Sequence, residues 1–307
     1  MDQKKANEVI AGIRRLLGDY FKKNGLTYAV FGKSEGLDSS VIAGLLSGVK
    51  GIRPIGVIMP CESDPDAERV GRLVLDHFNI PHIRLDLTRE FHGVMGLFYS
   101  ADGLYGQLCE ILKGCGDIDA ARGLSHKKSI AAGNIKARLR MITLYHIASL
   151  VGGLVVSTDN LSELHMGFWT LNGDVGDIAP IQHVFKGIEE YDIAEALGVP
   201  EESLNAVPTD GLDVTPGGVD EDQLGMPYPD IDRVIIGLIR SRFCEKDRFK
   251  EEEIPALAQK LSREIGYQPD EIAHVAERML KTDYKRHWPR VFQRDEIGLT
   301  EIEKMKI

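Results

Sequence analysis

The chain has 307 residues, of which 43% are hydrophobic and 27% are charged, and its formal net charge at pH 7 is −10. This composition is that of a globular protein with one large domain or two smaller ones, and the negative charge argues against a general affinity for nucleic acid. No apolar run approaches membrane-spanning length, and the first residues lack the apolar region of a signal peptide. We therefore expect a cytoplasmic protein that binds neither nucleic acid nor membranes.

The first 87 residues alternate between helical and strand patterns. Apolar residues at helical spacing predict a helix over residues 5–23. Short apolar runs predict buried strands over residues 28–31, 53–60 and 82–87, with helices from about residue 41 and over residues 64–78 between them. This order predicts an α/β fold with a doubly wound parallel sheet and helices on both faces. A ligand of such a sheet binds at the carboxyl ends of its strands.

A polar turn follows the first strand, at the place where that ligand is expected. It contains Gly32, Ser34, Gly36, Asp38 and Ser39, and a helix begins directly after it. A strand, a tight turn and a helix in this order present backbone N–H groups to a phosphate, and a carboxylate there can hold a cation. The turn opens with Gly32-Lys33-Ser34, but no Gly-Lys-Ser/Thr closes it at the spacing of the Walker pattern, which excludes that pattern. Taken alone, the stretch is also compatible with an ordinary capped turn.

The rest of the chain is less regular. In residues 88–127, glycines among scattered apolar residues predict one helix around 104–113 and loops elsewhere. Residues 129–150 are predicted to form a long helix, and residues 153–157 a fourth strand that ends in the polar run from Thr158 to Glu163. A Gly-, Pro- and Asp-rich loop to about residue 228 is expected to act as a lid. Further helices, including a C-terminal helical extension, are predicted over residues 188–197, 231–243, 252–260 and 270–281.

The turn at residues 32–39, Gly-Lys-Ser-Glu-Gly-Leu-Asp-Ser, resembles the Ser-Gly-Gly-x-Asp-Ser loop of the N-type ATP pyrophosphatases. Within that group, residues 133–141, 157–180 and 208–212 make the chain similar to the ammonia-dependent NAD synthetases, over about residues 8–292. The resemblance implies an adenine nucleotide alpha hydrolase-like fold and a single domain over residues 1–307 without a glutaminase domain. It also implies a homodimeric ligase that joins ammonia to deamido-NAD, using ATP and magnesium, through an adenylate and with release of AMP and pyrophosphate.

The resemblance also implies roles for individual residues. ATP contacts are implied for Gly32, Ser34, Gly36, Asp38, Ser39, Thr158, Lys186 and Thr209. Magnesium ligation is implied for Asp38 and Glu163, and a catalytic role for Asp38, Lys186 and Asp174. Contacts with deamido-NAD are implied for Arg138, Phe168, Asp177 and Lys285.

Four residues depart from the family pattern. Glu35 stands where the family has a glycine, so it brings an anion into the phosphate loop; Lys33, which stands at a usually apolar position, can offset that charge if its side chain turns inward. Leu171 and Tyr284 replace a lysine and a histidine that are common in the family. Two alternatives stay open: another ATP pyrophosphatase that makes amides, against which residues 157–180 argue, and a non-catalytic nucleotide-binding relative with a degraded loop, for which Glu35 is the motive.

Overall fold

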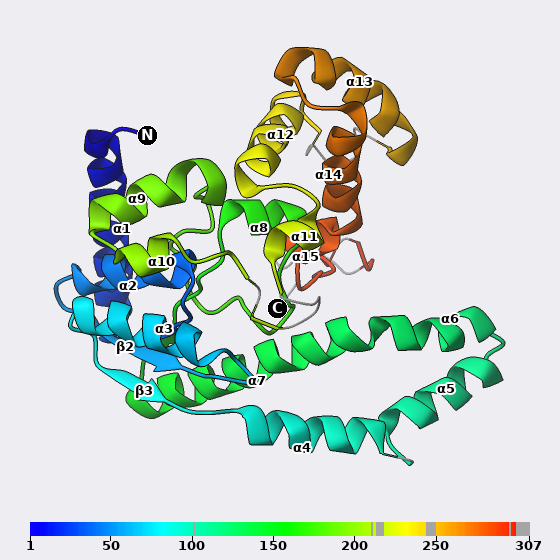
Figure 1. Cartoon of the computed structure of the whole chain (residues 1–307), viewed down its shortest axis with the longest axis horizontal. Helices are drawn as coiled ribbons and strands as arrows, with labels where there is room; N and C mark the ends of the chain where they lie inside the picture. Colours follow the sequence, from blue (N-terminus) through cyan, green and yellow to red (C-terminus); the bar gives the residue numbers. More distant parts are fainter. Residues whose placement is uncertain (101, 210, 213–217, 244–249, 295, 299–307) are drawn as a thin grey trace, which may run out of the picture. The chain divides into compact units, whose positions relative to one another are not determined.

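The computed structural model describes residues 1–100, 102–209, 211–212, 218–243, 250–294 and 296–298 (Figure 1). The chain divides into two compact units. The first comprises Met1–Glu163 with Trp169–Arg233, and the second comprises Leu164–Phe168 with Val234–Ile307. None of the helices in the described ranges has the length and apolarity needed to cross a bilayer.

A four-stranded parallel sheet organises the first unit. Its strands are β1 (Tyr28–Gly32), β2 (Arg53–Ile58), β3 (His82–Arg84) and β4 (Leu154–Val155), in the order β3-β2-β1-β4. The four predicted strands are confirmed, although β2, β3 and β4 are each shorter than predicted. Beyond Arg84, Leu85 and Leu87 make only single backbone hydrogen bonds to Ile58 and Pro60, so they do not continue the ladder. Because β2 and β4 lie on opposite sides of β1, the sheet changes direction between β1 and β4.

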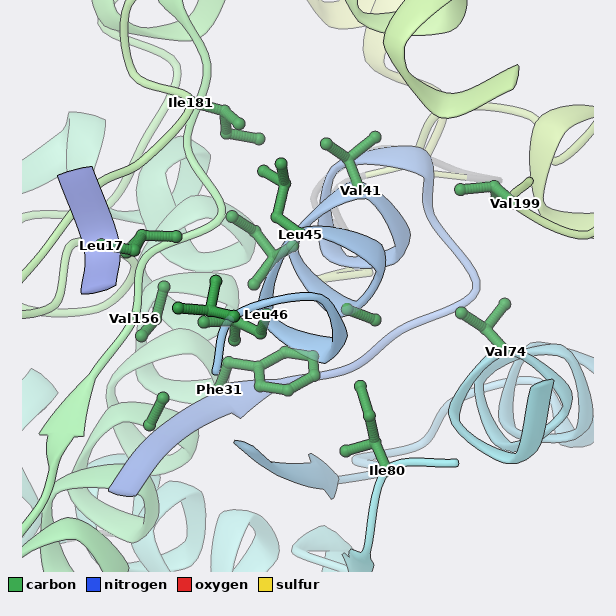
Figure 2. Close-up of a cluster of buried hydrophobic side chains, with 14 of the residues drawn as sticks. Leu17, Phe31, Val41, Leu45, Leu46, Val74, Ile80, Val156, Ile181 and Val199 are labelled. Atoms are coloured by element: carbon green, nitrogen blue, oxygen red, sulfur yellow. The ribbon is translucent and has the colours of Figure 1, made fainter. Parts of the chain in front are cut away.

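Helices cover both faces of this sheet, which confirms the doubly wound fold. In β1, Ala29 and Phe31 point into one buried cluster and Val30 points into the other, as expected for alternating side chains. The first cluster, part of which is shown in Figure 2, contains residues of α1 (Gln3–Lys23), α2 (Leu37–Ser47), α3 (Pro65–His77) and α9 (Tyr191–Leu197). The second contains residues of α4 (Thr88–Tyr99) and α7 (Lys128–Val151).

Residues 88–127 are mostly helical, and the prediction of loops on either side of one helix is wrong. The predicted helix is α5 (Leu104–Gly114); α4, α6 (Ile118–Gly123) and the 3₁₀ turn η1 (Leu124–Lys127) surround it. Gly93 and Gly96 misled the prediction. They lie inside α4, where an added Cβ would meet no atom within 4 Å, so they neither form turns nor allow a close approach. Their cost of about 1 kcal/mol each is tolerated in a helix that is anchored by the buried Phe91.

Segments after β4 complete the first unit. They are the first residues of α8 (Leu161–Met166), the π-helical turn η2 (Lys186–Glu190) that continues into α9, α10 (Glu201–Leu204), α11 (Asp220–Leu224) and the first residues of α12 (Tyr228–Arg240). The predicted helix over residues 188–197 is therefore a π turn followed by α9. The predicted lid contains α11 and an isolated bridge between Thr209 and Val219, while its residues 210 and 213–217 lie outside the described residues.

The second unit is helical, as predicted for the C-terminal extension. It contains the rest of α12, the 3₁₀ turn η3 (Glu251–Glu253), α13 (Ile254–Ile265), α14 (Pro269–Lys281) and α15 (Asp283–Arg286). Helices α13 and α14 are strongly amphipathic, and each buries four apolar residues at helical spacing. A capping box between Gln268 and Glu271 begins α14 and satisfies backbone N–H groups of its first turn.

Candidate active site

The carboxyl ends of β1 and β4 meet at the point where the sheet changes direction. Asp38, in the first turn of α2, follows β1, and Asn160 follows β4. The Asn160 Nδ2 group donates a hydrogen bond of 2.6 Å to Asp38 Oδ1, and Asn160 Oδ1 accepts from the Glu163 backbone N–H at 3.0 Å. Asn160 therefore orients Asp38 and also caps the turn that carries Glu163.

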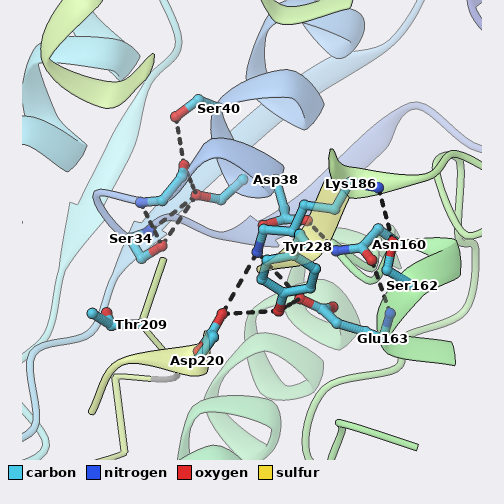
Figure 3. A network of polar contacts seen from close by, with 12 residues as sticks. Ser34, Asp38, Ser40, Asn160, Ser162, Glu163, Lys186, Thr209, Asp220 and Tyr228 are labelled. Atoms are coloured by element: carbon cyan, nitrogen blue, oxygen red, sulfur yellow. Dashed lines mark hydrogen bonds and ion pairs between the residues drawn. The ribbon is translucent and has the colours of Figure 1, made fainter. Parts of the chain in front are cut away.

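One ammonium group connects the acidic side chains of this site (Figure 3). The Lys186 Nζ atom lies 2.9 Å from Asp38 Oδ2, 3.3 Å from Glu163 Oε1 and 3.8 Å from Asp220 Oδ2. It also lies 4.6 Å from the centroid of the Tyr228 ring, whose hydroxyl donates to Asp220 at 2.9 Å. Asp38 and Glu163, separated by 125 positions in the sequence, thus converge on one cation.

The π turn η2 sets the position of Lys186. The Lys186 backbone N–H donates to Ser162 Oγ at 3.0 Å, and the Gly187 N–H donates to Asp232 Oδ2 at 2.7 Å. Ser162 and Asp232 are also hydrogen-bonded to each other, and both are fully buried. Gly187 is required here, because an added Cβ would lie 2.3 Å from the Pro229 backbone nitrogen. A π turn places one extra residue in a helical turn, a feature that is frequent at functional sites.

The charges of the cluster follow from burial and from Lys186. Burial lowers the pKa of Lys186, but Asp38, Tyr228, Glu163 and Asp220 overcome that effect and raise the pKa well above the usual value. Burial raises the pKa of Asp38, but Lys186 at close range lowers it below the usual value. For Glu163, burial dominates over the more distant Lys186, and the pKa is raised. The ion pair between Lys186 and Asp38 is therefore the permanent charge of the site.

Two further carboxyl groups lie in the same buried region. Glu190, the last residue of η2, is fully buried; burial, and then the charge of Asp38, raises its pKa. No donor in the described residues gives a hydrogen bond to its oxygens, so its neutral acid is placed to donate to Asp38. Asp159 is 5% exposed, and burial, followed by repulsion from Asp174, raises its pKa to about 7. The cluster therefore holds more acidic groups than its single lysine neutralises.

The turn at residues 32–39, here called the phosphate loop, is held together by hydrogen bonds from the buried side chain of Lys33. Its side chain is 4% exposed and turns inward, as the sequence required if it were to offset Glu35. The Lys33 Nζ group donates to Ser39 Oγ at 3.0 Å and Ser40 Oγ at 2.7 Å, and to the carbonyls of Ser34 and Gly36. Burial lowers the pKa of Lys33 to about 7, although Glu35 and Asp38 act in the opposite direction.

The loop also packs tightly against its neighbours. Ser34 Oγ accepts from the Gly36 N–H at 3.1 Å, and Ser203 of α10 donates to the Glu35 carbonyl at 2.8 Å. Gly71 of α3 lies directly against the loop, since an added Cβ would be 3.1 Å from the Ser34 carbonyl oxygen. Of the predicted ATP-binding residues, Gly32, Ser34, Gly36, Asp38 and Ser39 lie together in this segment.

Other predicted residues lie in the first unit. Thr158 lies three residues after the end of β4, and Thr209 Oγ1 donates to Glu35 Oε1 at 3.2 Å. Asp174 accepts a hydrogen bond from the Thr170 backbone N–H, and Arg138 Nε donates to the Leu171 carbonyl at 3.2 Å.

Asp177, also in the first unit, connects the chain after β4 to α7. It accepts from the Tyr145 hydroxyl at 3.0 Å and from the Val155 N–H at 2.9 Å, and burial followed by this carboxylate raises the pKa of Tyr145 to about 12.

Phe168 and Lys285 belong to the second unit. Lys285 Nζ donates to the Gly167 carbonyl at 2.6 Å, and the Arg278 guanidinium lies 5.6 Å from the centroid of the Phe168 ring. Gly167 has φ +59°, and an added Cβ would lie 2.2 Å from Thr282, so a glycine is needed on both counts. Within this unit the structure therefore brings Phe168 and Lys285 to the same short segment.

Sequence reasoning missed four members of the cluster: Asn160, Glu190, Asp220 and Tyr228. Asn160 lies in the polar run after the fourth strand, but the sequence pattern does not single it out from its polar neighbours. Glu190 lies at a helix start rich in acids, and Asp220 and Tyr228 lie in the predicted lid, so each has the appearance of a solvated residue. The signal that could have identified Asp220 is the aromatic Tyr228 eight residues later, but only the contact between them gives it meaning.

The acidic cluster has the donor chemistry of a magnesium site. Among the described residues no three His, Cys, Asp or Glu side chains are already arranged as a metal site. However, the carboxylates of Asp38 and Glu163 already share one cation, the Lys186 ammonium, and they are the hard oxygen ligands that Mg²⁺ prefers. The excess of acidic groups over lysines leaves room for more positive charge. The residues present therefore fit a divalent cation.

Comparisons with known proteins agree with this geometry. The sequence profile of the family described as NAD synthase matches residues 9–289. The NH(3)-dependent NAD(+) synthetase of Alkaliphilus metalliredigens is 36% identical over 234 residues, which cover 76% of this chain and 86% of that protein. The protein of the same name from Methanococcoides burtonii is 28% identical over 97% of this chain and 98% of its own length.

Solved structures share the fold. The NMN synthetase from Francisella tularensis superposes with a TM-score of 0.68 at 22% identity, covering 95% of this chain and 98% of that one. The NH3-dependent NAD synthetase from Campylobacter jejuni gives a TM-score of 0.67 at 21% identity, covering 95% and 100%. The profile match, which includes residues of both compact units, and the 36% identical relative define the class: the chain belongs to the NAD synthase family. The prediction of an ammonia-dependent NAD synthetase, a ligase of NAD biosynthesis that uses ATP as co-substrate, is confirmed.

Proposed function

We propose that the chain amidates deamido-NAD with ammonia at the end of the sheet where β1 and β4 meet, with ATP cleaved to AMP and pyrophosphate. The observation that carries the proposal is the convergence of Asp38 and Glu163 on Lys186, directly beside the phosphate loop. An adenylating enzyme needs cations and N–H donors around the departing pyrophosphate, and this end of the sheet supplies both.

The ATP site is proposed to extend from the loop across the sheet. The loop at Gly32, Ser34 and Gly36 and the start of α2 would receive the phosphates. The phosphate oxygens would then take over the N–H groups of Ser34 and Gly36, which in this structure donate to the Ser39 and Ser34 hydroxyls. Thr158 and Thr209 would contact the nucleotide. Lys186, whose pKa is raised well above the usual value, is proposed to contact the phosphates as a cation while it stays within reach of Asp38 and Glu163.

Magnesium is proposed to bind between Asp38 and Glu163. When bound, it would neutralise the charge that builds up on the leaving pyrophosphate. The Lys186 ammonium pairs with the same two carboxylates, so it stabilises their arrangement when metal and nucleotide are not bound. Asp38 is the stronger ligand of the two, since its pKa is lowered and that of Glu163 is raised.

Deamido-NAD is proposed to contact Arg138, Phe168, Asp177 and Lys285. Its nicotinate carboxylate oxygen attacks the α-phosphorus of ATP, forming the acyl adenylate as the bond to pyrophosphate breaks. Ammonia then adds to the acyl carbon and AMP leaves, so that no bond to a protein atom is formed. Asp174, which the resemblance places on the metal side of the site, is proposed to take part in catalysis there, near Asp159.

We also propose that the chain is a cytoplasmic homodimer whose two units form one synthetase domain. The family match over both units supports the single domain. Large apolar side chains exposed on the helices after β3 support a contact with a second copy: Leu97, Leu104, Ile111, Ile130, Ile142 and Leu150 are each more than half exposed. A dimer mass in analytical ultracentrifugation that becomes a monomer mass in Ile142→Asp would support this surface, and an unchanged dimer would exclude Ile142 from it.

The proposed reaction is tested with purified protein, deamido-NAD, ATP, magnesium and ammonium by measuring NAD and pyrophosphate together. Equal amounts of both are expected, with no product when ammonium or magnesium is left out. Asp38→Asn is expected to abolish the products, while Asp19→Asn, an exposed carboxylate of α1, leaves them unchanged. Release of pyrophosphate only when other substrates replace deamido-NAD and ammonium would favour a different amide ligase. Binding of ATP without formation of any product would favour a non-catalytic relative.

A further inference from the structure

We propose that the Glu35 side chain competes with the ATP phosphates for the Thr209 hydroxyl. Its carboxylate accepts a hydrogen bond from this hydroxyl in the free protein, loses it when the phosphates bind, and accepts it again when pyrophosphate leaves. This inference rests on the proposed ATP site and adds a residue that sets how tightly the phosphate loop holds an anion. Three observations support it: the contact with Thr209, the cation below the loop, and the way the backbone around Glu35 is held.

The contact joins two segments that are far apart in the sequence. Thr209 Oγ1 donates to Glu35 Oε1 at 3.2 Å, across 174 positions. Thr209 lies in the described part of the predicted lid, at an isolated bridge with Val219. A threonine hydroxyl that donates to a carboxylate oxygen can donate equally to a phosphate oxygen, since both are anionic acceptors. Glu35 therefore presents to Thr209 the same chemistry as the ligand proposed for it.

The cation that both anions share is Lys33. Its ammonium is held beneath the loop by Ser39, Ser40 and two backbone carbonyls, and the charge of Glu35 favours its protonated form. These partners inside the loop are neutral oxygens, so they leave its charge uncompensated from that side. A phosphate in the loop and the Glu35 carboxylate would be attracted to this one charge and would repel each other.

The backbone of Glu35 stays in place whatever its side chain does. Ser203 Oγ donates to the Glu35 carbonyl at 2.8 Å, and Ser203 is completely buried and also hydrogen-bonded to Ser40. The Glu35 side chain is partly exposed, so it can rotate away from Thr209 into solvent without disturbing the loop. Loss of the contact with Thr209 is then a side-chain movement only, which is fast enough to accompany each turnover.

The consequence is a loop that releases pyrophosphate readily. As pyrophosphate departs, the Glu35 carboxylate satisfies Thr209 and again faces the charge of Lys33, so the empty loop is not left with an unpaired cation. The same competition excludes weakly bound anions, because a ligand must interact with Thr209 and Lys33 more strongly than the single Glu35 carboxylate does. Glu35 is therefore a specificity-determining residue for anions with several phosphate oxygens.

The test compares pyrophosphate binding by calorimetry, with magnesium present, in the wild-type protein and in Glu35→Gln, Glu35→Ala and Glu202→Gln. Glutamine keeps an acceptor for Thr209 but has no charge, and alanine removes both. Glu202, exposed on the neighbouring helix α10, is the matched control for the loss of one negative charge. Both Glu35 variants are expected to bind pyrophosphate roughly tenfold more tightly, as for the loss of one charged hydrogen-bonded competitor, while Glu202→Gln binds as the wild type does.

Two more readouts separate competition from a purely structural role. In steady-state assays, Glu35→Gln is expected to lower the KM for ATP and to increase inhibition by added pyrophosphate, which a structural contact would not do. In a Thr209→Val background, the gain from Glu35→Gln is expected to shrink, because the shared partner is absent.

Each outcome decides the inference. Tighter pyrophosphate binding in both Glu35 variants supports it. If pyrophosphate binding is unchanged in Glu35→Gln and weaker in Glu35→Ala, Glu35 is only a structural link to Thr209. That result overturns this inference and leaves the proposed function standing. If neither the wild type nor any variant binds pyrophosphate, the ATP site itself is wrongly placed, and the proposed function fails together with this inference.

Discussion

The phosphate loop and the acidic cluster beside it are each built around one buried lysine, yet the two lysines have opposite properties. Lys33 is held by two hydroxyls and two carbonyls, and burial lowers its pKa to about 7. Lys186 is held by Asp38, Glu163 and Asp220, and these carboxylates raise its pKa well above the usual value despite burial.

The comparison shows that the partners of a buried amine, more than burial itself, decide whether it stays charged. Neutral oxygens satisfy the hydrogen bonds of Lys33 but only partly replace its hydration, so its charge is expensive. Carboxylates supply both hydrogen bonds and charge, so Lys186 is a permanent cation. The molecule therefore places a lysine that can lose its proton near neutral pH next to one that cannot.

The largest effect is expected from Lys186→Met, which leaves the carboxylates of the cluster without their cation. Breaking a buried ion pair by removing one partner costs about 3–5 kcal/mol of unfolding free energy. Product formation is expected to fall at least about a thousandfold, since charge on the departing pyrophosphate would also be left without this lysine. Urea unfolding and pyrophosphate release measure the two losses.

Lys4→Met, on the exposed face of α1, is the control for the Lys186 variant and should change neither quantity. A Lys186→Met protein that unfolds at the wild-type urea concentration would show that the carboxylates are solvated or protonated in the free protein, and the contrast between the two lysines would fail.

A smaller, pH-dependent effect is expected from Lys33→Met. The pKa of Lys33 is lowered on folding, so the wild-type protein gains stability as pH rises from about 7 toward the usual lysine pKa of 10.5, and the variant lacks this gain. Relative to the wild type, the variant should be most stable at pH 7 and below. Its advantage should then decline by up to about 1.4 kcal/mol per pH unit above pH 7.

Urea unfolding of wild type and Lys33→Met at pH 6.5, 8 and 9.5 measures this slope, and Lys4→Met again provides the reference for an exposed lysine. The loss of the hydrogen bonds to Ser39 and Ser40 shifts all three values equally, so it does not affect the test. A difference that stays constant over this pH range would mean that Lys33 remains fully charged in the folded protein.

The smallest effect is expected from Glu190→Gln at acid pH. Burial and the charge of Asp38 raise the pKa of Glu190, so its neutral acid is replaced by an amide of the same shape. At pH 4, below the usual glutamate pKa of 4.5, the unfolding free energy should change by no more than about 1 kcal/mol. As pH rises above 4.5, the wild type should lose stability, because the unfolded chain releases a proton that Glu190 keeps in the folded protein.

The Glu190 variant should not show that part of the decline, so it should become the more stable protein as pH rises above 4.5. Unfolding curves at pH 4, 6 and 7.5 measure this difference. A variant that is less stable than the wild type by more than about 2 kcal/mol at pH 6 would show that Glu190 is ionised and paired with Lys186, and the cluster would then contain one more permanent anion than inferred.

The sequence by itself determined the α/β architecture, the phosphate loop and the family. Apolar runs such as residues 28–31 form strands wherever they are buried on both faces, and the turn that follows needs its small and polar residues for local reasons. These patterns act over a few neighbouring residues, so they can be recognised in the chain. The same local reasoning failed for residues 88–127, because Gly93 and Gly96 lie in an exposed helix where their usual meaning does not apply.

Only the tertiary structure decided the partners of the charged groups. Asp38 meets Asn160 across 122 positions, and Glu35 meets Thr209 across 174, so no local pattern carries information about either contact. Whether Lys33 turns inward, and whether Lys186 meets carboxylates or water, depends on which segments the sheet order brings to its carboxyl edge. Because the state of a charge is set by burial and by neighbours within a few ångströms, it could be known only once those neighbours had been brought together.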